Sequence, residues 1–394
     1  MPQFTAGPAH KFRTGRHAPP ARLRDGRCGI TSGLHRGPGP PAPDHPRRAP
    51  GSSAVFFPDP LLPTLPDTPL ELEAALQLAV AAAERFRGAT APNPPVGCCL
   101  LDADGHVLAL AAHRRAGTAH AEAGAIAAAR ASGRAALIHT VVVTLEPCNH
   151  HGRTPPCTEA VLSTPARRVV IGARDPNPGV AGGGAARLAD AGLAVAMAAD
   201  LPGLAGAAGA CARLIAPFAK RAATGRPFVT VKQALDSTGS MIPPPGAKTF
   251  TSDAALRFAH GLRRRADAIL TGSGTVLADD PGFDVRRVPD HPERRRHLAV
   301  LDRRRRVPAA YLAAAEARGL LPFVAEEVGA ALDRLGEAGA LEVLVEAGPA
   351  VLASLDAVGL WDEWIVIRKG EGAEADHADI RGRDGRVETL ALVR

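Results

Sequence analysis

Apolar positions follow two different spacings along the chain, and their regular alternation begins near residue 67. Leucine and alanine recur at helical spacing over 67–88, so we expect a helix that starts at a cap on Asp67 or Thr68 and ends near Gly88. Two apolar runs then flank Asp-Ala-Asp-Gly at 102–105, which is typical of a β-hairpin. The pattern therefore predicts a helix followed by two paired strands.

The alternation continues to about residue 222. We expect, in order, an alanine-rich helix over 119–133, a buried strand at 140–145, a short helix near Glu159, a strand at 167–172, a helix and a strand over 185–197, and a helix from about 204 to 222. Strands that alternate with helices indicate an α/β domain in layers. We place this domain at 67–224.

Gly225 and Pro227 interrupt the pattern, and a second α/β domain is expected from 225 to 370. Its predicted strands lie at 228–233, 267–271, 297–301 and 342–346, and its predicted helices at 252–264, at 328–337 and from about 349. Residues 371–394 are rich in charged residues, so we expect a polar C-terminal tail there.

The first 66 residues differ from the rest of the chain in composition. They are rich in proline, glycine and arginine and lack apolar periodicity, so we expect a disordered N-terminal extension. This stretch holds nine lysines and arginines against three aspartates, and it therefore carries most of the net charge of +7. The remainder is nearly neutral, apart from arginine clusters at 263–265 and 303–306, and we expect no nucleic-acid partner.

Cysteine usage and hydropathy limit the location of the protein. The six cysteines show no disulfide framework, which indicates a reducing compartment, and we expect a cytoplasmic protein. Cys98 and Cys99 follow a strand pattern and are expected in the core. No run of about 18 apolar residues is present, so no membrane association is expected.

A metal-binding pattern is concentrated in two short segments. Zinc in a catalytic site takes three protein ligands and keeps one position open for water. His120 offers an imidazole, and Cys148 and Cys157 in PCNHHGRTPPC offer two thiolates. Glu122, two positions after the histidine, is expected to transfer protons as in the zinc deaminases, whose signature is H-x-E…P-C-x-x-C. Eight residues rather than two separate the cysteines here.

The segments HAE at 120–122 and TLEPCNHHGRTPPC at 144–157 resemble those of RibD, the bifunctional deaminase and reductase family of riboflavin biosynthesis. The resemblance continues through APNPPVG at 91–97 and DPNPGVAGGG at 175–184. It implies a three-layer, cytidine-deaminase-like domain that holds one zinc ion per chain. It also implies that Asn93 reads the pyrimidine edge, and that the ribose phosphate or base is contacted by His113, His150 and Arg153.

Two glycine-containing loops in the second half resemble the reductase domain of the same family. They are GSGT at 272–275 and EAG at 346–348, each directly after a predicted strand. The resemblance implies a dihydrofolate-reductase-like α/β domain that binds NADPH. It places Thr275, Asp279 and Gly348 on the cofactor, and it places four residues on the substrate: Lys232, Arg263, Arg286 and Glu346.

The function implied by this resemblance has two steps. Zinc-dependent hydrolysis deaminates 2,5-diamino-6-(5-phosphoribosylamino)pyrimidin-4(3H)-one, and NADPH then reduces the ribosyl group to a ribityl side chain. The partners implied are this small-molecule substrate and further copies of the chain in a homo-oligomer.

Three alternatives remain open. The chain has KQALDSTGS and Thr249-Phe250-Thr251 where the family usually has Ser-Leu-Asp-Gly and Trp-Ile-Thr, and the family's closing strands are not evident after 370. The protein could therefore be a deaminase alone, whose degenerate reductase domain is kept for assembly. A nucleic-acid deaminase is disfavoured by the near-neutral folded part. A binding module with structural zinc would need a fourth protein ligand.

Overall fold

The computed structural model describes residues 62–150, 155–177, 183–244, 246–247, 249–291, 293–370 and 375–393. The expected N-terminal extension lies outside the described residues as far as residue 61. Its last five residues are described, and Leu62 and Leu65 among them pack against the first hydrophobic core. The folded part therefore begins by Leu62 rather than at Asp67.

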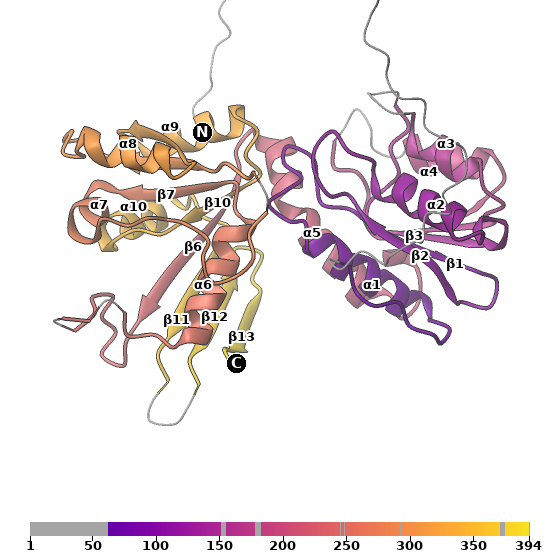
Figure 1. The fold of residues 1–394 in the computed structure, drawn as a ribbon, viewed down its shortest axis with the longest axis horizontal. Coiled ribbons are helices and arrows are strands. Elements are labelled where there is room, and N and C mark those ends of the chain that lie inside the picture. The colour runs from indigo at the N-terminus through magenta and orange to yellow at the C-terminus, as the bar shows by residue number, and fades with distance from the viewer. Residues whose placement is uncertain are drawn as a thin grey trace, which may run out of the picture. The chain divides into compact units, whose positions relative to one another are not determined.

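The first domain is built around a five-stranded sheet in the order β2-β1-β3-β4-β5. Figure 1 labels β1, β2 and β3 of this sheet. Its strands are β1 (Gly97–Leu101), β2 (Val107–Ala112), β3 (Thr140–Val143), β4 (Arg168–Ile171) and β5 (Ala194–Met197). β1 is antiparallel to both β2 and β3, while β3, β4 and β5 are parallel. Because parallel strands end at one edge of a sheet, the loops after β3 and β4 lie side by side.

Helices cover both faces of this sheet and give the three layers expected from the sequence. α1 (Leu72–Glu84) and α5 (Ala205–Thr224) pack on one face. The other face is covered by α2 (Ala121–Ala131), α3 (Cys157–Leu162) and α4 (Gly183–Asp190). α1 begins later than predicted, with Glu71 rather than Asp67 or Thr68 at its N-cap. Cys98 and Cys99 are fully buried, as predicted.

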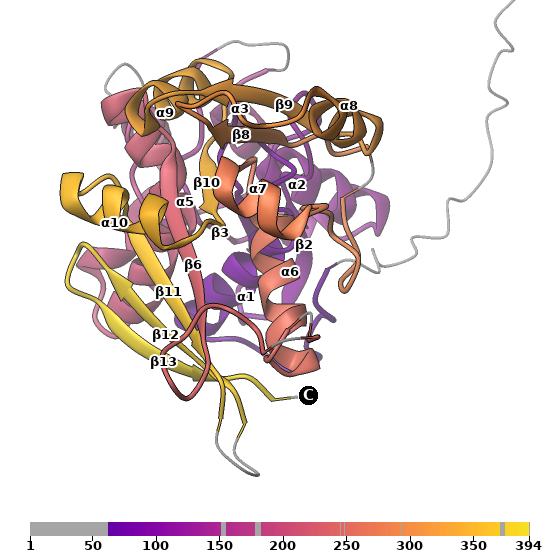
Figure 2. The ribbon, with the colours of Figure 1, turned by 90° about the vertical axis from the view of Figure 1, so that its left-hand side faces the viewer.

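The second domain contains an eight-stranded sheet in the order β13-β12-β11-β6-β10-β7-β8-β9. The strands are β6 (Phe228–Leu235), β7 (Ala268–Gly272), β8 (His297–Leu301), β9 (Leu321–Ala325), β10 (Glu342–Val345), β11 (Glu363–Arg368), β12 (His377–Gly382) and β13 (Val387–Ala391). All neighbours from β11 to β9 are parallel, and β12 and β13 extend the sheet as an antiparallel hairpin (Figure 2).

Helices again cover this sheet on two sides. One core joins the strands to α9 (Val328–Glu337) and α10 (Pro349–Val358). Two further cores join them to α6 (Asp253–Arg265), α7 (Ser273–Asp279) and α8 (Ala309–Ala317). The sequence pattern missed α7 and α8, and also the strands β9 and β11.

The expectation of a polar tail over 371–394 is wrong for its described part. β12 pairs with β11 and β13, and its apolar residues Ala378 and Ile380 alternate with polar ones and pack in one core with α6. The buried carboxylate of Asp376 accepts hydrogen bonds from the amides of Ser252 at 2.6 Å and Gly370 at 3.0 Å. This hairpin therefore belongs to the second domain.

No helix among the described residues is long and apolar enough to cross a bilayer. All five cysteines among them are free.

Candidate active sites

The three predicted zinc ligands converge in the first domain. His120 is the N-cap residue of α2, Cys148 lies in the loop after β3, and Cys157 is the first residue of α3. His120 Nδ1 lies 3.7 Å from Cys148 Sγ and 3.3 Å from Cys157 Sγ. The three ligand atoms lie within 4.8 Å of one another.

This spacing fits a tetrahedral zinc ion. Zn–S bonds of about 2.3 Å and Zn–N bonds of about 2.0–2.1 Å place sulfur and nitrogen about 3.6 Å apart at a tetrahedral angle. The two sulfur–nitrogen distances lie on either side of that value. Among the described residues the cluster holds three protein ligands and no fourth, which leaves one position open, as in catalytic zinc sites. The donor set therefore fits catalytic zinc.

The protonation preferences of the neighbouring groups suit the same chemistry. A hydrogen bond with the Cys157 thiol is the main influence that lowers the pKa of Cys148 to about 4; His120 adds to it and burial opposes it. A thiolate is the form that binds metal. Burial raises the pKa of Glu122, which is 3% exposed. A carboxyl group with a raised pKa can both accept and release a proton near neutral pH.

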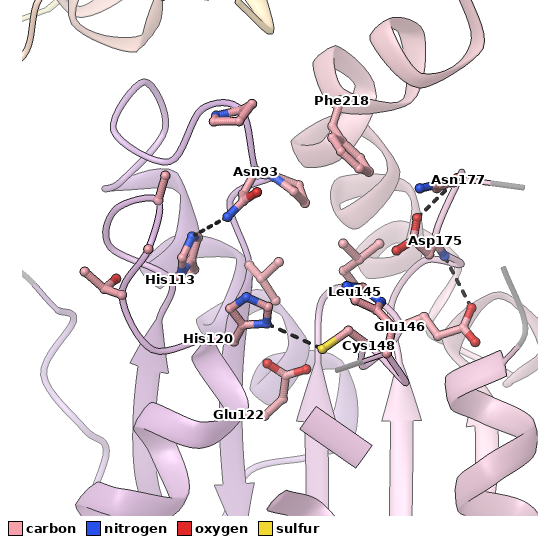
Figure 3. A pocket seen from close by; sticks show the side chains of 17 residues that line it. Asn93, His113, His120, Glu122, Leu145, Glu146, Cys148, Asp175, Asn177 and Phe218 are labelled. Atoms are coloured by element: carbon pink, nitrogen blue, oxygen red, sulfur yellow. Dashed lines mark hydrogen bonds between the residues drawn. The ribbon is translucent and has the colours of Figure 1, made fainter. Parts of the chain in front are cut away.

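A pocket of about 590 Å³ opens above the zinc ligands. Figure 3 shows Asn93 and His113 on one side of it and Asp175 and Asn177 on the other. Of the residues predicted for substrate, Asn93, His113 and His150 line the pocket, while Arg153 lies outside the described residues. Several side chains that line the pocket were not predicted from the sequence: Leu145, Glu146, Asp175, Asn177 and Phe218.

Asn93 and His113 form a defined pair. Asn93 Nδ2 lies 3.4 Å from His113 Nε2, and His113 Nδ1 lies 3.2 Å from the carbonyl oxygen of Ala119. Burial lowers the pKa of His113, so its ring is neutral; it donates from Nδ1 and accepts from Asn93 at Nε2. The Asn93 amide is thereby oriented, and its Oδ1 is the acceptor that it can offer to a ligand.

Three of the residues predicted to bind the reductase substrate form one charged cluster. Glu346 follows β10, and its carboxylate accepts hydrogen bonds from Nε of Arg263 at 2.5 Å and from Nη2 of Arg263 at 2.9 Å. Nζ of Lys232 lies 3.0 Å from its Oε2. Burial raises the pKa of Glu346, but Lys232 and Arg263 outweigh this effect and hold the pKa well below its usual value. Two cations thus face one buried carboxylate.

The fourth predicted residue, Arg286, lies in a loop attached to α6. Its backbone amide donates to His260 Nδ1 at 3.2 Å, and its guanidinium pairs with Asp284. The Arg263 side chain donates to the carbonyl oxygen of Asp284 at 3.2 Å. Buried His260 and half-buried Arg263 therefore hold the backbone of this loop beside the charged cluster.

The residues predicted for the cofactor are brought together in part. The amide of Gly348, at the N-cap of α10, donates to Thr275 Oγ1 at 3.0 Å. This bond joins the first turn of α7, which follows β7 directly, to the start of α10 after β10, and β7 and β10 are adjacent parallel strands. Asp279 is the last residue of α7, one helical turn after Thr275. Asp236 lies in the KQALDSTGS segment, where the family usually has the aspartate of Ser-Leu-Asp-Gly. Its side chain accepts hydrogen bonds from the amides of Thr238 and Ser240 within its own turn.

Two family models match the chain. The model of the cytidine and deoxycytidylate deaminase zinc-binding region matches residues 70–173, and that of the RibD C-terminal domain matches residues 227–368. The riboflavin biosynthesis protein RibD of Aquifex aeolicus is 33% identical over 337 residues, which cover 78% of this chain and 90% of the relative. The chain belongs to the RibD family.

Other RibD proteins agree with this assignment. That of Escherichia coli is 42% identical over 205 residues, covering 52% of this chain and 53% of its own length. The crystal structure of a diaminohydroxyphosphoribosylaminopyrimidine deaminase/5-amino-6-(5-phosphoribosylamino)uracil reductase from Thermotoga maritima has a TM-score of 0.66 at 30% identity. The matched region covers 75% of this chain and 86% of the Thermotoga maritima chain.

Membership of the RibD family confirms the main sequence-based expectations. The fold is a cytidine-deaminase-like domain followed by the RibD C-terminal domain, and both are α/β domains. The chain is a riboflavin-biosynthesis deaminase plus reductase. Its deaminase domain has a zinc site of one histidine and two cysteines, and its reductase domain implies a nicotinamide cofactor.

Proposed function

We propose that this chain releases ammonia from 2,5-diamino-6-(5-phosphoribosylamino)pyrimidin-4(3H)-one in its first domain and reduces the product's ribosyl group in its second. One observation carries the first step: His120, Cys148 and Cys157 form a three-ligand site, with Glu122 close by, beneath a pocket of about 590 Å³. A structural zinc site would use a fourth protein ligand and would not need this pocket.

The residues of the first domain have separate tasks in this proposal. His120, Cys148 and Cys157 would hold a zinc ion, which would supply the acidification that makes a water molecule nucleophilic at neutral pH. Glu122 would take a proton from the water as its oxygen bonds to C2 and would pass that proton to the adjacent ring nitrogen. It would then carry the proton of the new hydroxyl group to the amino group, which departs as ammonia. The C–N bond breaks, and a carbonyl group remains at C2. Asn93, held by His113, orients the pyrimidine edge, and His150 and Arg153 contact the ribose phosphate.

The second domain is proposed to use NADPH. The ring-opened ribose has a C1′=N bond; NADPH would supply a hydride to C1′ and a proton would be added to the nitrogen, which leaves a ribityl chain and NADP⁺. The hydrogen bond between Gly348 and Thr275 supports a cofactor site at this edge of the sheet, and Asp279 is assigned to it by resemblance. Lys232, Arg263, Arg286 and Glu346 are proposed to bind the substrate. The completed sheet, with β12 and β13, favours a working reductase over a degenerate one.

We also propose a cytoplasmic homo-oligomer that acts on small molecules and not on nucleic acid. The free cysteines among the described residues support a reducing compartment. The near-neutral charge after residue 66 argues against a nucleic-acid substrate.

A coupled assay on the purified full chain tests the proposal. Ammonia release and NADPH oxidation are followed separately with the phosphoribosylated diaminopyrimidine, for the wild type and for Glu122→Gln. We expect both signals from the wild type. The variant should keep one zinc per chain and lose ammonia release by about 10²–10⁴-fold. Ammonia without NADPH oxidation would favour the deaminase-only alternative, and no ammonia from a zinc-loaded wild type would overturn the assignment.

A further inference from the structure

One wall of the deaminase pocket comes from the segment between β4 and α4. Asp175 and Asn177 of this segment line the pocket, opposite Asn93 and His113 (Figure 3). The zinc ligand Cys148 comes from a different loop, after β3. The distance between this wall and the zinc site therefore depends on what ties the two loops together.

A single buried carboxylate makes that connection. Glu146 lies two positions before Cys148 and is 4% exposed. Its Oε1 accepts hydrogen bonds from the amides of Gly184 at 3.1 Å and Ala185 at 3.0 Å, and its Oε2 accepts one from the amide of Asp175 at 3.3 Å. The side chain thus holds the start of α4 and the pocket wall at once.

Backbone contacts reinforce the same junction. The amide of Glu146 donates to the carbonyl oxygen of Ala173 at 2.9 Å. A Cβ atom at Gly184 would lie 1.9 Å from the carbonyl oxygen of Pro147, so only glycine allows α4 to start this close to the zinc loop. By contrast, a Cβ atom at the neighbouring Gly183 would meet nothing within 4 Å.

We propose that Glu146 is a positioning residue of the deaminase, which sets substrate affinity by fixing the wall at Asp175 and Asn177 relative to the zinc ligands. Glu146 accepts three amides with two oxygens, so it has a structural reason to be a carboxylate rather than an amide. It neither holds the metal nor transfers a proton in this assignment. The inference rests on the deaminase activity proposed above.

The test compares Glu146→Ala and Glu146→Gln with the wild type as full-length proteins. Glutamine keeps one acceptor oxygen for α4 but turns an NH₂ group toward the amide of Asp175. We expect KM for ammonia release to rise about tenfold in Glu146→Gln and more in Glu146→Ala, with kcat within about threefold of the wild type. Zinc should stay at one per chain, and NADPH oxidation on already deaminated substrate should be unchanged.

A double-mutant cycle separates positioning from a merely structural role. If Glu146 acts through the wall, Glu146→Ala should raise KM far less in a background that already carries Asp175→Ala and Asn177→Ala, because coupled sites are not additive. Fully additive effects would overturn the proposal. So would a fall in melting temperature with an unchanged KM, or loss of zinc.

A second pair of variants covers the case in which Glu146→Ala does not fold. Gly184→Ala displaces the same junction and should raise KM, whereas Gly183→Ala should leave it unchanged. An unchanged KM in a folded Gly184→Ala would also count against the proposal. A wild type that releases no ammonia would instead refute the proposed function itself, so the two failures are distinguishable.

Discussion

Nζ of Lys232 lies 3.0 Å from Oε2 of Glu346, in the middle of the sheet of the second domain. Glu346 is 7% exposed and also pairs with Arg263, so removing its charge leaves two cations that face each other in a buried place. We expect Glu346→Gln to lower the free energy of unfolding by about 3 kcal/mol, the scale for breaking a buried ion pair. Urea denaturation of the full chain measures it.

An exposed pair in the same domain provides the control. Arg226 and Asp333 also form a salt bridge, but their side chains are 35% and 52% exposed. Asp333→Asn should therefore change the free energy of unfolding by no more than about 1 kcal/mol. Equal losses in the two variants would show that burial does not determine the strength of the Glu346 cluster.

Metal removal should separate the two activities. Because the zinc ligands all belong to the first domain, a chelator should abolish ammonia release and leave NADPH oxidation on deaminated substrate intact. Adding zinc back should restore ammonia release. Loss of both activities on chelation would mean that the metal also stabilises the second domain.

The bond between Thr275 and Gly348 predicts a cofactor effect. Thr275→Val keeps the shape of the side chain but removes the acceptor of the Gly348 amide. We expect a loss of about 1 kcal/mol in stability and a KM for NADPH about tenfold higher. Thr275→Ser retains the hydroxyl group and should resemble the wild type, while the deaminase kinetics of both variants should not change.

His260 should make the second domain less stable in mild acid. Burial, then Arg263 and Arg286, lower its pKa to about 4, although Asp284 and Glu346 oppose this. An unfolded histidine has a pKa of about 6.5, so between these values the unfolded state binds more protons, and stability falls as pH falls.

His260→Gln removes this contribution and still offers an oxygen to the Arg286 amide. The stability advantage of the wild type over the variant should therefore shrink between pH 7 and pH 5, as measured by urea unfolding. A constant difference across that range would contradict the assignment of a neutral, buried His260.

The sequence predicted the zinc site because its chemistry depends on residue types that are rare in this chain. The triad of His120, Cys148 and Cys157 needs only those residues and a fold that brings the loops together. Phe218 and Glu146 were missed for opposite reasons. Phe218 is one apolar residue on an alanine-rich helix, and Glu146 acts through backbone amides, which leave no pattern in a sequence.

The same limit applies to the secondary structure. Strands buried on both faces, such as β7 and β10, are continuous apolar runs and were predicted well. β12 and β13 lie at the edge of the sheet, and only one of their faces packs against a helix. Their outward positions hold residues such as Asp379 and Arg381, so the segment resembled a charged tail.

The position of β6 also bears on how the protein is made. β6 is the first strand of its sheet to be synthesised, yet its two neighbours are β10 and β11, which begin at residues 342 and 363. The strands of the deaminase sheet all lie between residues 97 and 197 and can pair as they leave the ribosome. β6 therefore stays without its neighbours while more than a hundred further residues are added, and such long-range pairing is slow and leaves unpaired strand edges prone to aggregation.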